Sequence, residues 1–304
     1  MPNWKQVLDE LNRSGSTFDI VRRSYLRRFA NRTKRNVIIY YSGWLQKPGI
    51  PNIEINDQDK IGFMTTVHQL DKAKGLDLVL HTPGGDVAAT ESIGEYLREI
   101  FGIDIRIFVP QLAMSGGTML SCIGKEIHMG KQSSLGPIDP QHRGLPVYGV
   151  IEEFEQAHKE IKADQSKMYV WQPIIAKYTP ALIGECAKAL KWADQLARKW
   201  LLSGMFANDQ DGPARVDEIV RGLTDHAGTK SHNRHLSATS CSEIGFGDKI
   251  KKLEDDHLLQ DMLLSIHHAC MLTFQRTDAV KIIENQKGIA YINQQRMIRI
   301  EGIS

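Results

Sequence analysis

Two short glycine-containing turns are the places in this sequence where residue type and spacing could support chemistry. The first, HTPGGD, spans His81–Asp86, and the second, AMSGGT, runs from Ala113 to Thr118. Glycine lets the backbone approach a ligand closely, so amide N–H groups in such a turn can stabilise a developing oxyanion. In the second turn, Ser115 stands where a strand is expected to become a helix, which exposes its hydroxyl and aims the helix N-terminus at it. Each turn alone is also typical of tight packing, but the Ser115 turn could supply a nucleophile and, through the Gly116 N–H, a second oxyanion donor.

The elements that must position these turns are predicted by hydrophobic patterning. Apolar runs typical of buried strands precede the turns, as LDLVLHT and DIRIFVP, and further strands are expected at NVIIYYSGW and EIHMG. A helix is expected from Asp57 to about Lys74, with one face formed by Ile61, Met64, Val67 and Leu70. Another helix, DVAATESIGEYLREIFG, should end at Gly102. Strands alternating with helices predict a parallel sheet in an α/β fold.

The second half of the chain has a mostly helical pattern. Residues 149–178 predict one long helix or a broken pair, and another helix should follow Pro180. A short helix is expected to start at Ser237 with Gly245 after its end, and a last helix to span about Asp255–Phe274. We expect one compact unit in three parts: a basic amphipathic helical arm at 1–36, a core at 37–250 and a C-terminal helical extension at 251–304.

Composition excludes several classes of protein. The 304 residues are 41% hydrophobic and 24% charged, which excludes a disordered, collagen-like or coiled-coil chain. The net charge of +2 gives no argument for a nucleic-acid or membrane partner, so no nucleic acid is expected. The four cysteines are far apart, so neither a disulfide scaffold nor a zinc finger is expected. With no signal-peptide pattern and no transmembrane segment, we expect a soluble, cytoplasmic protein.

The charge is concentrated at the N-terminus. Residues 1–36 hold nine basic residues against three acidic ones, a local balance of +6 that leaves −4 for the rest of the chain. The stretch STFDIVRRSYLRRFANRTKR predicts one amphipathic helix. It could be an arm that binds nucleic acid or an anionic membrane, but packing on the body or on a second subunit is favoured.

Three motifs together resemble the Clp-fold serine peptidases. His81–Asp86 matches a TPGG turn, Ser115–Thr118 a Ser-Gly-Gly-Thr nucleophile turn, and Leu135–Gln141 a Leu-Gly-Pro-Ile-Asp-Pro-Gln segment. The pattern is similar to ClpP, to the signal peptide peptidase A group and, most closely, to the bacterial and archaeal serine dehydrogenase proteinase family. The likeness covers about residues 37–275 and also includes HNRHLSATSCSEIGFGDKI. It implies the ClpP/crotonase spiral of ββα units, here with helical N- and C-terminal extensions.

The resemblance also implies roles for individual residues. Ser115 falls on the nucleophile, and Gly85 and Gly116 fall on the two oxyanion-hole amides. Gly84 and Gly117, beside them, are expected to contact substrate. No cofactor is implied.

The resemblance does not identify the general base, because the sequence departs from ClpP at both positions that partner the nucleophile. Asp139 falls where ClpP carries its catalytic histidine, and the sequence around Asn233 falls where ClpP carries its acid, flanked here by His232 and His235. A swapped arrangement is therefore expected, with a histidine from the later loop as base and Asp139 orienting it. Asp139 could instead only hold a rigid turn between prolines.

Two alternatives to a histidine base follow from the same segments. The signal peptide peptidase group uses a lysine, and the candidates here are Lys159, Lys162 and Lys167. His232 and His235 also have a His-x-x-His spacing, but no third ligand follows at a recognisable distance, so no metal is expected.

The favoured function is a serine endopeptidase that acts on peptides or unfolded proteins. The alternatives are a crotonase-type acyl-CoA enzyme, with Asp86 and Asp139 as cleft carboxylates, or a non-catalytic assembly protein of the same fold. A homo-oligomer is expected, with the N-terminal arm and the helices after residue 149 as interfaces. No ATP-binding loop motif is present in the sequence, so any ATP dependence would need a separate unfoldase or adaptor, whose identity is unknown.

Overall fold

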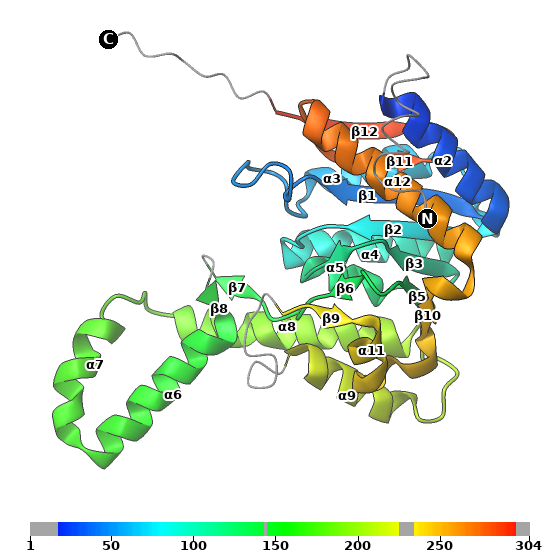
Figure 1. The fold of residues 1–304 in the computed structure, drawn as a ribbon. Coiled ribbons are helices and arrows are strands. Elements are labelled where there is room, and N and C mark those ends of the chain that lie inside the picture. The colour runs from blue at the N-terminus through cyan, green and yellow to red at the C-terminus, as the bar shows by residue number, and fades with distance from the viewer. Residues whose placement is uncertain (1–17, 143–144, 225–233, 296–304) are drawn as a thin grey trace, which may run out of the picture.

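A seven-stranded sheet forms the centre of the computed structural model, in which residues 18–142, 145–224 and 234–295 are described. Five neighbouring strands run parallel, and two strands from the end of the chain are added antiparallel at one edge (Figure 1). In sheet order they are β10 (Ile250–Lys252), β5 (Glu126–Met129), β3 (Ile105–Val109), β2 (Leu76–His81), β1 (Asn36–Ser42), β11 (Ala279–Asn285) and β12 (Ala290–Gln294). The predicted α/β fold is confirmed.

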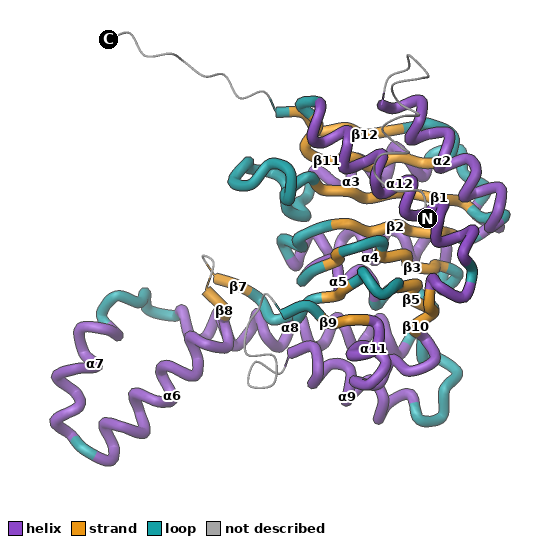
Figure 2. The backbone as a smooth tube through the Cα atoms, in the orientation of Figure 1, coloured by secondary structure: helices purple, strands orange, loops and turns teal. Residues whose placement is uncertain are grey.

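Helices cover both faces of this sheet (Figure 2). One face carries α2 (Phe18–Thr33) and α12 (His257–Arg276). The other face carries α3 (Gln58–Val67), α4 (Val87–Phe101), α8 (Leu182–Leu202) and α9 (Gly212–Thr224). Every residue of β1 and β2 is buried, as strands between two helical layers require. Among the described residues, no helix is long and apolar enough to cross a membrane.

The helices that follow β1 and β2 show where the helix ends and faces predicted from the sequence agree with the structure. α4 ends as expected before Gly102, whose positive φ of 59° suits a residue without a side chain. The helix expected from Asp57 to about Lys74 is too long, because α3 ends at Val67. Of its expected face, Val67 and Leu70 are buried but Ile61 and Met64 are exposed. The reason is Gly62: a Cβ there would lie 2.4 Å from Ile283, so the glycine side of α3 packs on β11.

The expected C-terminal helical extension is also wrong beyond α12. Residues 279–294 form β11 and β12, and β11 pairs with β1 in the centre of the fold. The segment AVKIIEN is buried along its whole length, and its β-branched residues suit a strand. A turn at Gly288, with φ of 82°, reverses the chain between the two strands. The end of the chain therefore completes the core.

The described part of the basic arm packs on the body of the protein. α2 buries Val21, Leu26 and Phe29 against α12 and the sheet. Arg22 is fully buried and donates from Nε to Glu284 of β11 at 2.6 Å. The favoured interpretation, an arm that packs on the body, is therefore what residues 18–33 show. The remainder of the arm, residues 1–17, lies outside the described residues.

A helical projection extends from the body beside α8 (Figure 1). It consists of α6 (Val147–Ala163) and α7 (Met168–Ile175), the broken pair that the sequence allowed. A small cluster of Val147, Val150, Leu182 and Cys186 packs α6 against α8. On α7, Met168, Tyr169 and Val170 are 48%, 77% and 57% exposed, so the projection presents apolar side chains to solvent.

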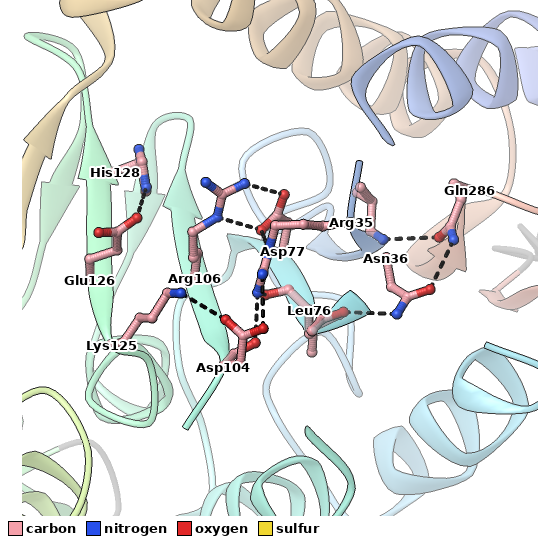
Figure 3. A network of polar contacts seen from close by, with 12 residues as sticks. Arg35, Asn36, Leu76, Asp77, Asp104, Arg106, Lys125, Glu126, His128 and Gln286 are labelled. Atoms are coloured by element: carbon pink, nitrogen blue, oxygen red, sulfur yellow. Dashed lines mark hydrogen bonds and ion pairs between the residues drawn. The ribbon is translucent and has the colours of Figure 1, made fainter. Parts of the chain in front are cut away.

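A polar network ties the strands together near the amino ends of β2 and β3, away from the predicted turns (Figure 3). The buried carboxylate of Asp77 accepts hydrogen bonds from Arg35 at 2.8 Å and from two nitrogens of Arg106 at 2.7 Å each. Asp104 pairs with Arg35 at 2.9 Å and Lys125 at 2.7 Å, and the hydrogen bond from Arg35 is the main reason why the pKa of Asp104 falls to about 2. This network binds neighbouring strands at one end of the sheet and leaves the other end for a site.

The four cysteines take no part in disulfide bonds. Cys122, Cys186, Cys241 and Cys270 are free and buried. Burial raises the pKa of Cys122 and of Cys241 to about 12, so both thiols remain protonated. The fold is held by packing rather than by covalent cross-links.

Candidate active site

The two glycine turns lie side by side at the carboxyl end of the sheet. After β2, Thr82 pairs with the short strand β4 (Leu112–Ala113) that follows β3. The Thr82 N–H donates to the Leu112 carbonyl at 3.0 Å, and the Met114 N–H donates to the Thr82 carbonyl at 3.0 Å. Two segments that are 30 residues apart in sequence are thereby joined directly.

Ser115 has a strained backbone conformation at the start of α5 (Gly116–Ser121). Its φ of 48° and ψ of −114° lie in a region that residues with a side chain rarely adopt. Hydrogen bonds hold the turn: the Gly117 N–H donates to the Met114 carbonyl at 2.7 Å, and the Met119 N–H to the Ser115 carbonyl at 3.0 Å. Such a strand-to-helix turn presents a serine hydroxyl in the manner of a nucleophile elbow.

Glycine is required where the first turn meets Ser115. Gly84 has a φ of 97°, and a Cβ at this position would lie 2.7 Å from the Ser115 Cβ and 2.8 Å from the Gly116 nitrogen. Any side chain here would push the two turns apart. Gly84 therefore allows the backbone of the first turn to pack directly on the nucleophile turn.

The direction of the Gly85 amide follows from the pairing of its neighbours. The Gly84 carbonyl accepts from the Ile55 N–H at 2.7 Å, and the Asp86 N–H donates to the Ile55 carbonyl at 2.9 Å. Because alternate peptide groups of an extended strand point to opposite sides, the Gly85 N–H points away from Ile55. A Cβ on Gly116 would lie 3.3 Å from the Gly85 nitrogen, so the two predicted oxyanion amides are neighbours.

Ser115 lies in the wall of a cleft of about 560 Å³. Gly84 and Gly85 form part of the same wall. The remaining lining residues are mostly apolar, namely Pro83, Val87, Met119, Ile138, Pro140, Ala189 and Trp192, with Glu54, Asp86 and Gln141 as the polar members. A cleft of this size and character suits a short stretch of peptide.

Gly116 and Gly117 lie behind Ser115 and are not part of the cleft lining. Both are buried. A Cβ on Gly117 would lie 2.5 Å from Thr82 Cγ2, so this glycine allows α5 to pack on the first turn. Gly84 lines the cleft, whereas Gly117 does not, and the expected contact of Gly117 with substrate stays a prediction.

The third motif is tied to the nucleophile turn through Thr118. β6 (Ser134–Leu135) pairs with β4, and Gly136 follows it. Thr118 Oγ1 accepts from the Gly136 N–H at 2.9 Å and lies 2.8 Å from the Gly136 carbonyl and 2.9 Å from the Ala113 carbonyl. Asp139 comes next; it is only 2% exposed and stands between Ile138 and Pro140, which both line the cleft.

The two candidate histidines come from the segment before β9 (Leu236–Ser237). β9 pairs antiparallel with β6, and β6 pairs parallel with β4, so His235 before β9 and Ser115 after β4 lie at the same end of the small sheet, on its two outer strands. His235 is exposed and does not line the cleft. His232 lies outside the described residues.

The candidate lysines are remote from the cleft lining. Lys159 and Lys162 lie on α6 and Lys167 precedes α7, and all three are exposed on the projection. In the described part of the chain, no hydrogen bond joins Ser115 Oγ to a histidine, lysine or carboxylate, and no histidine or lysine lines the cleft. No set of three metal-ligating side chains occurs among the described residues either.

His81 lies on the far side of the first turn, in a buried histidine cluster. It is fully buried, and its ring centroid is 5.0 Å from that of His267 and 5.4 Å from that of Tyr41. Burial lowers the pKa of His267 to about 3 and holds the pKa of His81 well below its usual value. Both imidazoles are therefore neutral, and neither lines the cleft.

Several residues of the site carry no sequence signal. Ile55 lies in a loop without periodicity, and Ala189 and Trp192 come from α8, more than 70 residues after Ser115. Trp192 is 40% exposed, and its Nε1 donates to Glu91 at 2.9 Å. Nothing in the sequence of α8 indicates that Ala189 and Trp192 face the two glycine turns.

A parallel α/β sheet that joins a strained serine turn to a glycine turn at its carboxyl end defines a Clp-like α/β protein. Residues 13–184, more than half of the chain, match the family of ClpP-like SDH-type serine proteinases. The chain belongs to this family, as its three motifs predicted.

Two relatives from Methanocaldococcus jannaschii are themselves described only as uncharacterized proteins. One is 26% identical over 193 residues, which cover 64% of this chain and 58% of that protein. The other is 27% identical over 248 residues, which cover 80% of this chain and 78% of that protein. The chain thus spans less than two thirds of the first relative. No solved structure gives a significant match.

Proposed function

We propose that this chain is a serine endopeptidase that hydrolyses peptide bonds through an acyl-enzyme on Ser115. The observation that carries the proposal is the strained Ser115, at φ 48°, in the wall of a 560 Å³ cleft and against the Gly84–Gly85 turn. Membership of a serine proteinase family supports the same reaction.

In the proposed reaction, Ser115 Oγ attacks the carbonyl carbon of a bound peptide while a base removes its proton. The N–H groups of Gly85 and Gly116 donate to the oxyanion of the tetrahedral intermediate. When the intermediate collapses, the C–N bond breaks and the protonated base gives its proton to the leaving amine. Water then attacks the acyl-enzyme, which releases the acid and restores Ser115. One oxyanion donor is typically worth about 2.7–4 kcal/mol of the barrier.

For the base, we propose a histidine of the segment before β9, His232 or His235, with Asp139 as its orienting acid. Asp139 is buried beside two lining residues, and β9 begins at the same end of the small sheet at which β4 leads into Ser115. The lysine alternative is weaker, because Lys159, Lys162 and Lys167 are exposed on the projection and a lysine base needs burial.

The acyl-CoA alternative depended on carboxylates that are free to act in the cleft. Asp86 is instead the N-cap of α4, where its side chain accepts from the Ala89 N–H at 2.8 Å. This engagement favours the peptidase.

The proposed substrates are peptides or unfolded proteins, and the proposed setting is a cytoplasmic homo-oligomer. The exposed apolar side chains of α7 support self-association. Light scattering at micromolar concentration tests this part, and a monomer would contradict it.

Hydrolysis of an unfolded, fluorescently labelled protein tests the function itself. Wild-type protein should release fluorescent peptides, and the Ser115→Ala variant should release none. Acyl-CoA binding is measured on the same samples. If the crotonase-type alternative is correct, the wild-type protein should bind acyl-CoA and release no fluorescent peptides.

A further inference from the structure

The oxyanion turn depends on a short segment that precedes α3, residues 53–56. Ile55 of this segment pairs with the backbone on both sides of Gly85, at 2.7 Å and 2.9 Å. Its side chain also reaches the second turn, since a Cβ on Gly116 would lie 3.2 Å from Ile55 Cδ1. Any displacement of Ile55 would therefore move the Gly85 amide relative to Ser115.

Residues 53–56 contain no helix or strand of their own, and side chains hold them in place. The Glu54 carbonyl accepts from Lys281 Nζ at 2.7 Å, and the Asn56 N–H donates to Asp59 Oδ2 at 3.0 Å. These two contacts lie immediately before and after Ile55. Both end on the same pair of charged side chains.

Lys281 and Asp59 form a buried ion pair between β11 and α3. Lys281 Nζ lies 2.8 Å from Asp59 Oδ1 and 2.9 Å from Oδ2, and the two side chains are 1% and 2% exposed. The Tyr40 hydroxyl donates to Asp59 Oδ2 at 2.8 Å. Burial lowers the pKa of Lys281, while the charge of Asp59 opposes that shift.

Stability alone does not account for such a pair. Desolvation of two charges often costs as much as their attraction provides, and well-packed apolar replacements of a buried pair are commonly neutral or stabilising. The pair instead fixes the position of the segment around Ile55. The Lys281 ammonium group bonds to Asp59 and to the Glu54 carbonyl, and the Asp59 carboxylate accepts from the Asn56 N–H.

We propose that Lys281 and Asp59 are positioning residues that fix the Gly84–Gly85 oxyanion turn through the segment around Ile55. The catalytic meaning of this inference rests on the proposed function. The geometric claim, that the pair orders the turn, stands independently and can be tested without turnover.

The test replaces the pair by apolar residues, Lys281→Met with Asp59→Leu, so that no unpaired charge stays buried. The matched control is Arg22→Met with Glu284→Leu, which removes another fully buried ion pair. Within the described part of the chain, the hydrogen bonds and ion pairs of Arg22 and Glu284 do not involve residues 53–56. Amide hydrogen exchange is measured for peptides covering 82–90 and 113–121, together with saturation kinetics of labelling by a fluorophosphonate probe.

We expect exchange of the 82–90 peptide to become about tenfold faster in the Lys281/Asp59 double variant and to stay unchanged in the control. The labelling rate at saturating probe should fall about 100-fold. The probe concentration that gives half of the maximal rate should change little, because misplaced oxyanion donors slow the reaction and do not weaken binding of the probe. Unchanged exchange and an unchanged labelling rate in a folded double variant would overturn the inference.

Two further outcomes are covered by the same experiment. If the double variant does not fold, Asp59→Asn, which keeps the shape of the side chain, must show the faster exchange of the 82–90 peptide or the inference fails. If wild-type protein is not labelled at all, the proposed function fails, while the exchange measurement still decides whether the pair orders the turn.

Discussion

A methyl group on Gly85 would fall 2.3 Å from the backbone nitrogen of Ile55 and 2.4 Å from its carbonyl oxygen. Distances this short cannot be accommodated unless the two backbones separate. The glycine thus allows the pairing that directs the Gly85 N–H away from Ile55, and the Gly85 nitrogen lies 3.3 Å from the position of a Cβ on Gly116.

Gly85→Ala should lower the rate of fluorophosphonate labelling about 100-fold, because displacement of the turn misplaces an oxyanion donor. Gly49→Ala is the matched control: Gly49 also has a positive φ, 79°, but nothing lies within 4 Å of its Cβ position. Its labelling rate should equal that of the wild type. Equal rates for the Gly85 variant would show that the turn does not set the rate.

Thr118→Val should destabilise the protein by about 1–3 kcal/mol, because it leaves the buried Gly136 N–H without its acceptor. Urea unfolding measures the difference. Thr65→Val serves as control, since Thr65 is exposed and bonds only within α3; its change should stay within about 0.5 kcal/mol. A Thr118→Val variant as stable as this control would show that the hydrogen bond between Gly136 and Thr118 does not stabilise the fold.

The proposed base predicts that either His232→Ala or His235→Ala abolishes labelling of Ser115, whereas Lys162→Ala and Lys167→Ala leave the rate unchanged. The comparison uses one probe at several pH values. Loss of labelling in a lysine variant, with both histidine variants active, would contradict the histidine assignment.

Folding stability should fall as the pH drops below about 6.5, the ordinary pKa of histidine. Burial lowers the pKa of His267 to about 3, so between these values the unfolded chain binds more protons than the folded one. Each such histidine contributes a slope of up to about 1.4 kcal/mol per pH unit.

His267→Phe should therefore flatten the stability profile between pH 5 and 6.5. Urea unfolding at several pH values gives the profiles of the wild type and the variant. An equal slope in wild type and His267→Phe would argue against a neutral buried imidazole.

The parts of the fold that could be predicted from the sequence are those with local causes. β1 and β2 are buried on both faces, so both are mostly apolar, although Asp77 lies near the start of β2, and α4 has an N-cap at Asp86 and a glycine at its end. The turn at Gly84 could be recognised because glycine tolerates its positive φ, whereas the turn at Ser115 could be recognised only from the glycines that follow the serine and from the motif as a whole.

The parts that could not be predicted depend on tertiary contacts. Lys281 interrupts the apolar run of β11, and its charge is tolerated only because Asp59, 222 residues away in sequence, faces it. Ile61 and Met64 fit an apolar helix face as well as Phe63 does, and the other face is selected by tertiary packing, of Gly62 on Ile283 and of Phe63 on Tyr40. The same limit applies to Trp192, which lines the cleft, and to Ile55, which pairs with the Gly85 backbone behind it.

The most direct measurement of the central claim is mass spectrometry of the protein after reaction with a fluorophosphonate probe. We expect one adduct on wild-type protein, located on Ser115 in the peptide that contains AMSGGT, and no adduct on Ser115→Ala. An unmodified wild-type protein, or an adduct that persists in Ser115→Ala, would contradict the claim that Ser115 is the nucleophile.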